Sequence, residues 1–166
     1  GEIRKQDQAQ VLFEAMHTGH SVYATVHADS ISETITRLTN PPISVPSNLL
    51  TAVNLNVVMF RDRRRGIRRV YQLGEYLVGE EGKGIRPNIL YRYKPVEDSI
   101  VQHSTSLRLF DELSTYTGMT QQEIAQDLKE KEKILNMMAK ENIREINDVG
   151  SEIHKYYTGR DKVLKN

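Results

Sequence analysis

The stretch TGHSVYATVHADS, residues 18–30, decides the fold class of the first part of the chain. Val, Tyr and Thr fill much of residues 21–27, and this composition predicts a short strand. Gly19 can end a preceding helix over residues 6–18, and Asp29 or Ser30 can cap a following helix that carries Ile31, Ile35 and Leu38. Helix, strand and helix in this order are typical of a layered sheet, so we predict an α/β fold.

Further elements are predicted outward from this stretch. A short helix begins at Pro46-Ser47 and ends before Leu55. Apolar and β-branched runs bounded by glycines or prolines then predict three strands, over residues 55–61, 67–78 and 89–93. Pro95 and the residues after it are predicted to join two domains, an α/β part over residues 1–95 and a helical part over residues 96–166.

The second part of the chain has helical periodicity. Leu107, Phe110 and Leu113 share one face of a helix that ends near Gly118. The sequence TQQE, residues 120–123, is a capping box that opens a long helix. Four apolar side chains of that helix are predicted to face inward: Ile124, Leu128, Leu135 and Met138. A last helix carries Val149, Ile153 and either Tyr156 or Tyr157.

Composition excludes several classes of protein. The 166 residues are 38% hydrophobic, which is enough for a folded core, and the formal net charge is +1. The absence of cysteine rules out a disulfide scaffold and a cysteine nucleophile. No apolar run approaches the ~20 residues of a membrane-spanning helix. We therefore expect a soluble protein of the cytoplasm.

The densest group of chemically active side chains lies in the first thirty residues. Glu2 precedes three histidines, His17, His20 and His27, two of which flank the predicted strand. A carboxylate and imidazoles at strand ends would suit a site at the carboxyl edge of a sheet. The histidine spacing matches no standard zinc pattern, and exposed, solvated side chains remain the alternative.

Charge is concentrated in the middle of the chain. Residues 61–95 carry ten basic and four acidic side chains, net +6, and six of the basic ones are arginines within RDRRRGIRR, residues 61–69. A solvated or subunit-contacting hairpin is favoured over a nucleic-acid or acidic-membrane contact, because no aromatic side chain interrupts the run. The glycines at 79, 82 and 84 do not form a phosphate-binding loop, since no Gly-Lys-Ser/Thr follows them.

Short motifs add a resemblance to a known family. In chain order these motifs are GEIR at 1–4, TGH at 18–20, ATVHADS at 24–30, RL at 37–38 and PPISVP at 41–46. Together they resemble the second half of the motor ATPases of type II secretion, type IV pilus and archaellum assembly, with the HADS and PPIxVP forms similar to archaeal members. The resemblance implies the second half of a RecA-like P-loop ATPase core, followed by a small α-helical C-terminal domain.

The resemblance also implies roles for individual residues. Glu2 matches the Walker B acid, which polarises the attacking water and contacts the metal only through water. His20 and His27 match the catalytic His box. Arg4, Thr18 and Gly19 match positions on the nucleotide side, with Arg4 holding the loop. Lys5 departs from the Asp or Gly usual in the family.

The implied parent protein is a hexameric ATPase that uses ATP and Mg²⁺ and works with a membrane platform protein, at or near the inner face of the membrane. The Gly-x-x-x-x-Gly-Lys-Ser/Thr loop that holds phosphates is absent from these 166 residues, so the chain alone is expected to be inactive. Two alternatives stay open. One is a non-catalytic interaction module that uses Arg61–Arg69, and the other is a relative that transports DNA.

Overall fold

A computed structural model describes residues 1–163 of the chain. These residues form two compact units, which divide between Asp111 and Glu112. The predicted joint at Pro95 lies instead inside the sheet of unit 1, in the turn between two strands. Within residues 1–163 no helix combines the length and the apolar character needed to cross a membrane.

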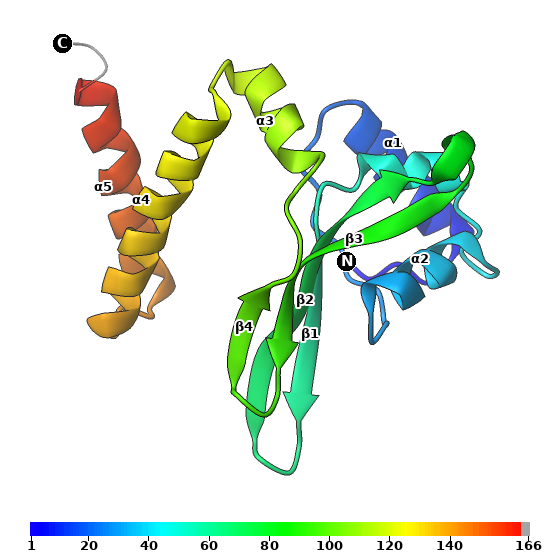
Figure 1. The fold of residues 1–166 in the computed structure, drawn as a ribbon, viewed down its shortest axis with the longest axis horizontal. Coiled ribbons are helices and arrows are strands. Elements are labelled where there is room, and N and C mark those ends of the chain that lie inside the picture. The colour runs from blue at the N-terminus through cyan, green and yellow to red at the C-terminus, as the bar shows by residue number, and fades with distance from the viewer. Residues whose placement is uncertain (164–166) are drawn as a thin grey trace. The chain divides into compact units, whose positions relative to one another are not determined.

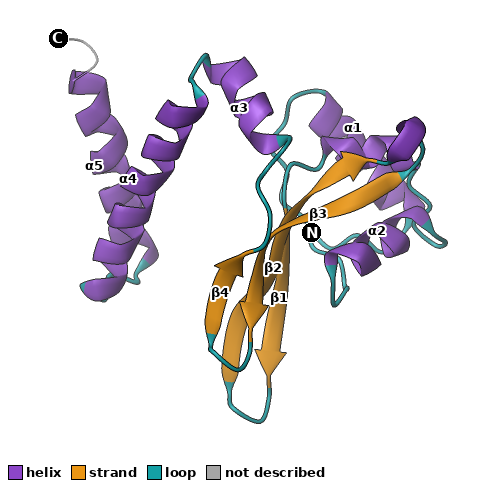
Figure 2. Cartoon of the chain, viewed as in Figure 1, coloured by secondary structure: helices purple, strands orange, loops and turns teal. Residues whose placement is uncertain are grey.

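Unit 1 is an α/β structure with an antiparallel sheet (Figures 1 and 2). The strands β1, β2, β3 and β4 lie side by side in chain order, and every neighbouring pair is antiparallel. Their bounds are Asn56–Asp62, Ile67–Val78, Ile85–Lys94 and Ser99–Gln102. The sequence predicts β2 with its observed bounds, whereas β3 is longer than predicted and β4 was not predicted.

Helices α1 (Gln6–His17) and α2 (Ile31–Thr39) form the other part of unit 1, together with the 3₁₀ helix η1 (Ser47–Ala52). Their apolar faces and the near half of the sheet share one core, in which Phe13, Ile31, Leu50 and Tyr76 are almost fully buried. Ser30 caps α2, because its hydroxyl accepts a hydrogen bond from the amide of Glu33 at 3.1 Å. A second 3₁₀ turn, η2 (Glu80–Gly82), joins β2 to β3.

The predicted strand over residues 21–27 does not form as a strand. A single parallel bridge links Glu2 to Thr25, and the rest of the segment has no regular pairing. A strand needs a run of paired residues, and within the described residues this segment has backbone pairing only at Thr25, with Gly1 and Ile3. Val and Thr therefore marked an extended segment, but extension alone does not make a strand.

Unit 2 contains α4 (Gln121–Lys140) and α5 (Ile146–Val163), and α3 (Leu109–Thr117) spans the division between the units. The predicted capping box is present in full, since Thr120 and Glu123 each accept a hydrogen bond from the other residue's amide. Ile124 and Met138 are buried as predicted. Leu128 and Leu135 are exposed, because the buried side of α4 runs through Ile124, Asp127 and Met138 instead.

Candidate functional site

Glu2 is placed by two backbone hydrogen bonds near the start of the chain. The amide of Ile3 donates to the carbonyl of Thr25 at 2.9 Å, and the amide of Thr25 donates to the carbonyl of Gly1 at 2.9 Å. Residues 1–3 and residue 25 are thus held side by side in parallel. Side chains two apart in an extended segment point to the same side, so this pairing brings His27 toward Glu2.

The Glu2 carboxylate has a basic side chain beside each oxygen. Arg4 Nη2 donates to Glu2 Oε2 at 2.6 Å, and His27 Nε2 lies 3.3 Å from Glu2 Oε1. The Arg4 guanidinium, by its hydrogen bond, is the main cause of a lowered pKa for Glu2, and the charges of Arg4, His27 and Arg37 act in the same direction. The Glu2 side chain is 25% exposed, against 76% for His27, so the carboxylate lies under a more accessible imidazole.

His20, Thr18 and Gly19 form a second small group, at the end of α1. The hydroxyl of Thr18 lies 3.1 Å from His20 Nδ1 and donates to the carbonyl of Ala15. Gly19 has φ +86, a conformation that glycine adopts without a steric penalty, and it lets the amide of His20 reach back to the carbonyl of Ala15. These contacts hold the imidazole against the end of the helix.

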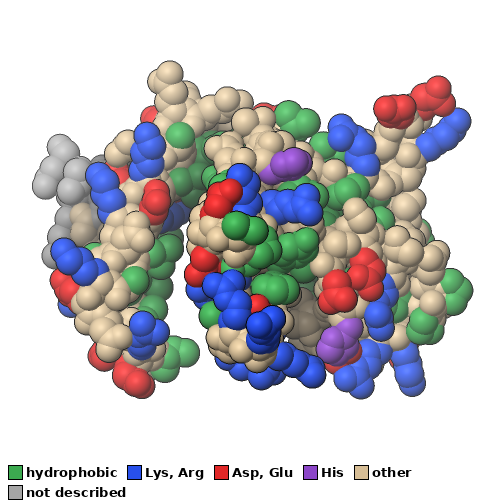
Figure 3. Space-filling view, turned by 60° about the horizontal axis from the view of Figure 1, so that its bottom comes forward, with side chains coloured by type: hydrophobic (Ala, Val, Ile, Leu, Met, Phe, Trp, Pro, Cys, Tyr) green, Lys and Arg blue, Asp and Glu red, His purple; other side chains and the backbone are tan. Residues whose placement is uncertain are grey.

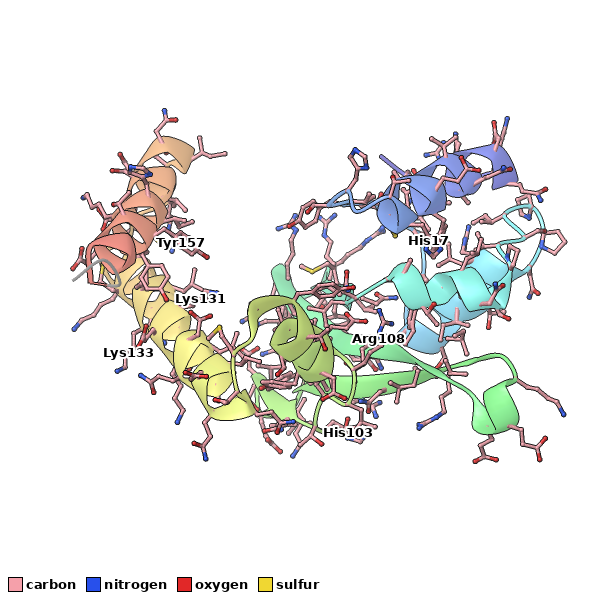
Figure 4. The ribbon with its side chains drawn as sticks, turned by 90° about the horizontal axis from the view of Figure 1, so that it is seen from above. His17, His103, Arg108, Lys131, Lys133 and Tyr157 are labelled. Carbon is pink, nitrogen blue, oxygen red and sulfur yellow. The ribbon has the colours of Figure 1, made fainter. Side chains whose placement is uncertain are left out.

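The sequence predicted one site that contains Glu2, His20 and His27, and the structure shows direct contacts within two groups. Glu2, Arg4 and His27 form one, which we call the Glu2 cluster; Thr18 and His20 form the other. His17 ends α1, where Figure 4 labels it, and takes part in neither group. The catalytic and nucleotide-side roles of these residues remain predictions.

The side chains described around Glu2 do not supply a set of metal ligands. Across the described residues no three His, Asp or Glu side chains come together as metal ligands. Mg²⁺ needs several oxygen ligands, so Glu2 does not form a metal site by itself. A single carboxylate near the surface fits a contact through metal-bound water, which is the role that the resemblance implies.

Comparison with known proteins decides the family. A family model for type II/IV secretion system proteins matches residues 1–164. The chain belongs to the type II/IV secretion system protein family. This result confirms the resemblance drawn from the GEIR, TGH and ATVHADS motifs.

Individual relatives agree with this family. An uncharacterized protein of Methanocaldococcus jannaschii is 34% identical over 145 residues, which cover 86% of this chain and 20% of that protein. A second protein of the same organism is 31% identical over 170 residues, covering 97% of this chain and 28% of the relative. The type IV pilus assembly ATPase PilB of Pseudomonas aeruginosa is 48% identical over 56 residues, covering 33% of this chain and 10% of PilB. The chain thus spans less than a third of the length of each of these relatives.

In this member of the secretion family, sequence reasoning missed a buried carboxylate. Glu75 of β2 has no exposed surface, and its two oxygens accept hydrogen bonds from residues that lead into α3. The amides of Leu107 and Leu109 donate to it at 2.8 and 3.0 Å, and the hydroxyl of Ser106 donates at 2.8 Å. Asn88 of β3 adds a fourth donor at 2.8 Å. The sequence pattern that could have indicated Glu75 is a single acidic residue in a strand, close to Leu73, Tyr76 and Leu77.

Glu75 thereby caps α3 from a distant strand. The first amides of a helix have no partner within the helix, and a negative charge at that end is favourable. Burial by itself raises the pKa of the Glu75 carboxyl, but the hydrogen bonds from Leu107, Asn88, Ser106 and Leu109 outweigh it and the pKa is lowered. Arg108 adds a second link between β2 and the start of α3, which we call the α3 joint together with the Glu75 contacts. Its guanidinium donates to the carbonyls of Val53 and Tyr76 at 3.2 and 3.1 Å (Figure 4).

Proposed function

We propose that this chain is the carboxyl-terminal part of an ATPase that hydrolyses ATP to power protein secretion or the assembly of pilus-like or archaellum-like filaments. One observation carries the proposal: in a chain matched along residues 1–164 to the secretion family, Glu2 lies between Arg4 and His27. Such a cluster supports phosphoryl transfer, which depends mainly on positioning and charge neutralisation.

Within this proposal Glu2 orients the attacking water. Its lowered pKa keeps the carboxylate charged at neutral pH, so it can accept a hydrogen bond from water. The same lowered pKa makes it a weak base, and orientation is therefore a better description of its role than proton abstraction.

The basic side chains around Glu2 have a separate role. Arg4 holds the carboxylate in place through its 2.6 Å hydrogen bond. His27 is the most exposed member of the cluster, and it faces the phosphate end of ATP in the proposed complex. His20, Thr18 and Gly19 lie at the end of α1, where a backbone turn presents the second imidazole.

The wider assembly belongs to the same proposal. Unit 1 would complete a RecA-like core, and the helical residues would form the C-terminal domain. The parent protein would be a cytoplasmic hexamer that uses Mg²⁺ with ATP and docks on a membrane platform protein. Mg²⁺, when bound, would neutralise phosphate charge, and Glu2 would reach it through water.

Phosphate binding would come from polypeptide outside these 166 residues. The family function needs a Gly-x-x-x-x-Gly-Lys-Ser/Thr loop, and the sequence contains none. We therefore expect the chain by itself to show no ATP turnover above the protein-free blank.

The test compares two proteins: the purified chain of residues 1–166 and the full product of the gene that encodes it. Phosphate release from ATP is measured with Mg²⁺ and after chelation of Mg²⁺. The proposal predicts Mg²⁺-dependent turnover in the full product and none in the 166-residue chain. Turnover by the 166-residue chain, or a full product that fails to hydrolyse ATP, would contradict it.

A further inference from the structure

Two turns lie together at the end of the sheet that is remote from α1 and α2 (Figure 1). One joins β1 to β2 through residues 63–66, and the other joins β3 to β4 through residues 95–98. A bidentate ion pair connects them, since Arg69 Nε and Nη2 donate to the two oxygens of Asp98 at 2.8 Å each. We call residues 61–69 and 92–100 the arm tip.

The acids of the arm tip are already engaged. Asp62 Oδ1 accepts the amides of Arg64 and Arg65 at 2.9 and 3.1 Å, which uses it to close its own turn. The Arg69 guanidinium and then the Tyr93 hydroxyl hold the pKa of Asp98 far below its usual range. Glu97 Oε1 lies 3.4 Å from Lys94 Nζ and forms an ion pair with it. The three acids of the arm tip therefore offset only part of the charge of its eight basic side chains.

The arginines of the arm tip form a surplus of positive charge. Residues 61–69 contain six arginines and one aspartate, net +5. Arg61, Arg63, Arg64 and Arg68 are exposed and have no acidic partner among the residues that the structure describes. Basic side chains accordingly gather in the lower middle of Figure 3, where the arm tip faces the viewer.

Apolar side chains are exposed at the same end. Val96, in the β3–β4 turn, is 99% exposed, and Ile100 of β4 is 49% exposed. Met59 of β1 is 64% exposed. A turn that carries a fully exposed valine next to unpaired arginines combines the two features of an interfacial membrane contact, apolar insertion and attraction to anionic headgroups.

We propose that the arm tip binds the surface of a bilayer rich in anionic phospholipid. Guanidinium groups match phosphate oxygens in a fork geometry, and several of them on one turn can contact several headgroups. No aromatic side chain lies in residues 61–69 to stack on a base, so nucleic acid is less well suited. The binding site goes beyond the proposed ATPase, and its test needs no nucleotide.

The experiment measures co-sedimentation of the 166-residue chain with vesicles. One set contains equal parts of phosphatidylglycerol and phosphatidylcholine, and the other contains phosphatidylcholine alone. The chain should bind the anionic vesicles and lose this binding as salt is raised. Arg63→Gln/Arg64→Gln should weaken binding about thirtyfold at low salt, as the loss of two surface cations predicts.

A matched variant controls for charge alone. Lys83→Gln/Arg86→Gln removes two exposed cations at the opposite end of the sheet and should leave vesicle binding within about twofold of the unmodified chain. Val96→Asp should weaken binding without removing any cation. Thermal unfolding of each variant confirms that the fold is kept.

Four results would overturn the proposal: no binding to anionic vesicles, equal binding to neutral vesicles, equal losses in the two double variants, or unchanged binding of Val96→Asp. Tighter retention by duplex DNA or by polyglutamate than by the anionic vesicles would also overturn it, in favour of a nucleic acid or an acidic protein.

Discussion

Two glutamates of unit 1 show how the same side chain serves different purposes. Glu2 lies near the surface, with Arg4 and His27 as its partners. Glu75 is fully buried, and its oxygens accept three backbone amides, a hydroxyl and a side-chain amide. Both carboxyl groups have a lowered pKa, so the charge state alone does not distinguish them.

Their partners do distinguish them. Backbone amides cannot move without moving the chain, so Glu75 is part of the structure of the α3 joint. The partners of Glu2 are long or exposed side chains, which can exchange a contact with the carboxylate for one with a ligand. We therefore assign a structural role to Glu75, and we propose a chemical role for Glu2.

The largest expected effect on stability comes from Glu75→Ala. The change leaves the part-buried amides of Leu107 and Leu109 and the Ser106 hydroxyl without their acceptor, at about 1–3 kcal/mol for each lost partner. We expect the free energy of unfolding of unit 1 to fall by about 3 kcal/mol or more, measured by urea denaturation with circular dichroism.

Glu80→Ala is the matched control, because Glu80 is an exposed carboxylate in η2. It should change stability by less than about 0.5 kcal/mol. Hydrogen exchange adds a local measure: Leu107 and Leu109 should lose amide protection in the Glu75 variant. An equal loss of unfolding free energy in Glu75→Ala and Glu80→Ala would contradict the structural role assigned to Glu75.

The pH dependence of stability should sharpen the same distinction. The pKa of Glu75 is lowered by folding, so its charge stabilises the fold above the ordinary glutamate pKa of about 4.3, and this contribution is lost as the pH falls through the folded value. Glu75→Gln should cost about 2 kcal/mol near neutral pH. The difference from the unmodified chain should shrink on acidification, and a constant difference would show that Glu75 is not ionised in the fold.

Thr120→Ala tests an exposed cap against the buried one. Thr120 accepts the amide of Glu123 at 3.3 Å and opens α4. Its removal should destabilise unit 2 by about 1 kcal/mol, less than the loss at Glu75, because water can replace an exposed hydroxyl. Ser151→Ala in the interior of α5 is the control, and thermal unfolding is the measurement; a larger loss for Thr120 than for Glu75 would reverse the expected order.

Arg4→Gln should have the smallest effect on the fold. The Arg4–Glu2 pair is close to the surface, where ion pairs contribute little to stability. The pKa of Glu2 should nevertheless rise toward its ordinary range, since the Arg4 hydrogen bond is the main cause of its lowering. NMR titration of the Glu2 side chain measures this change, and an unchanged pKa would mean that His27 and Arg37 suffice.

Local signals predicted much of this fold from the sequence. The bounds of β2 followed from glycines and a β-branched run, and the capping box at Thr120 followed from a fixed spacing. Gly19 adopts the positive φ expected of a helix stop. The motifs in residues 1–30 located the Glu2 cluster, because they are close together in sequence.

Features that depend on distant partners were not predictable. Residues 21–27 have strand composition, but a strand also needs a run of paired residues, and in the described residues only Thr25 is paired. β4 follows a turn and pairs with residues 91–94 of β3, and this pairing across the turn, not a pattern within its own four residues, makes it a strand. The α3 joint links residues about thirty positions apart, which no local pattern records.

The most direct test of the two assigned roles compares Glu2→Gln with Glu75→Gln in the full product of the gene. ATP turnover and the thermal unfolding midpoint are measured on both variants, with turnover assayed well below that midpoint. We predict that Glu2→Gln lowers turnover at least about a hundredfold and leaves the midpoint unchanged, whereas Glu75→Gln lowers the midpoint and keeps most of the turnover. Unchanged turnover in Glu2→Gln, or a midpoint lowered as far as in Glu75→Gln, would contradict the account.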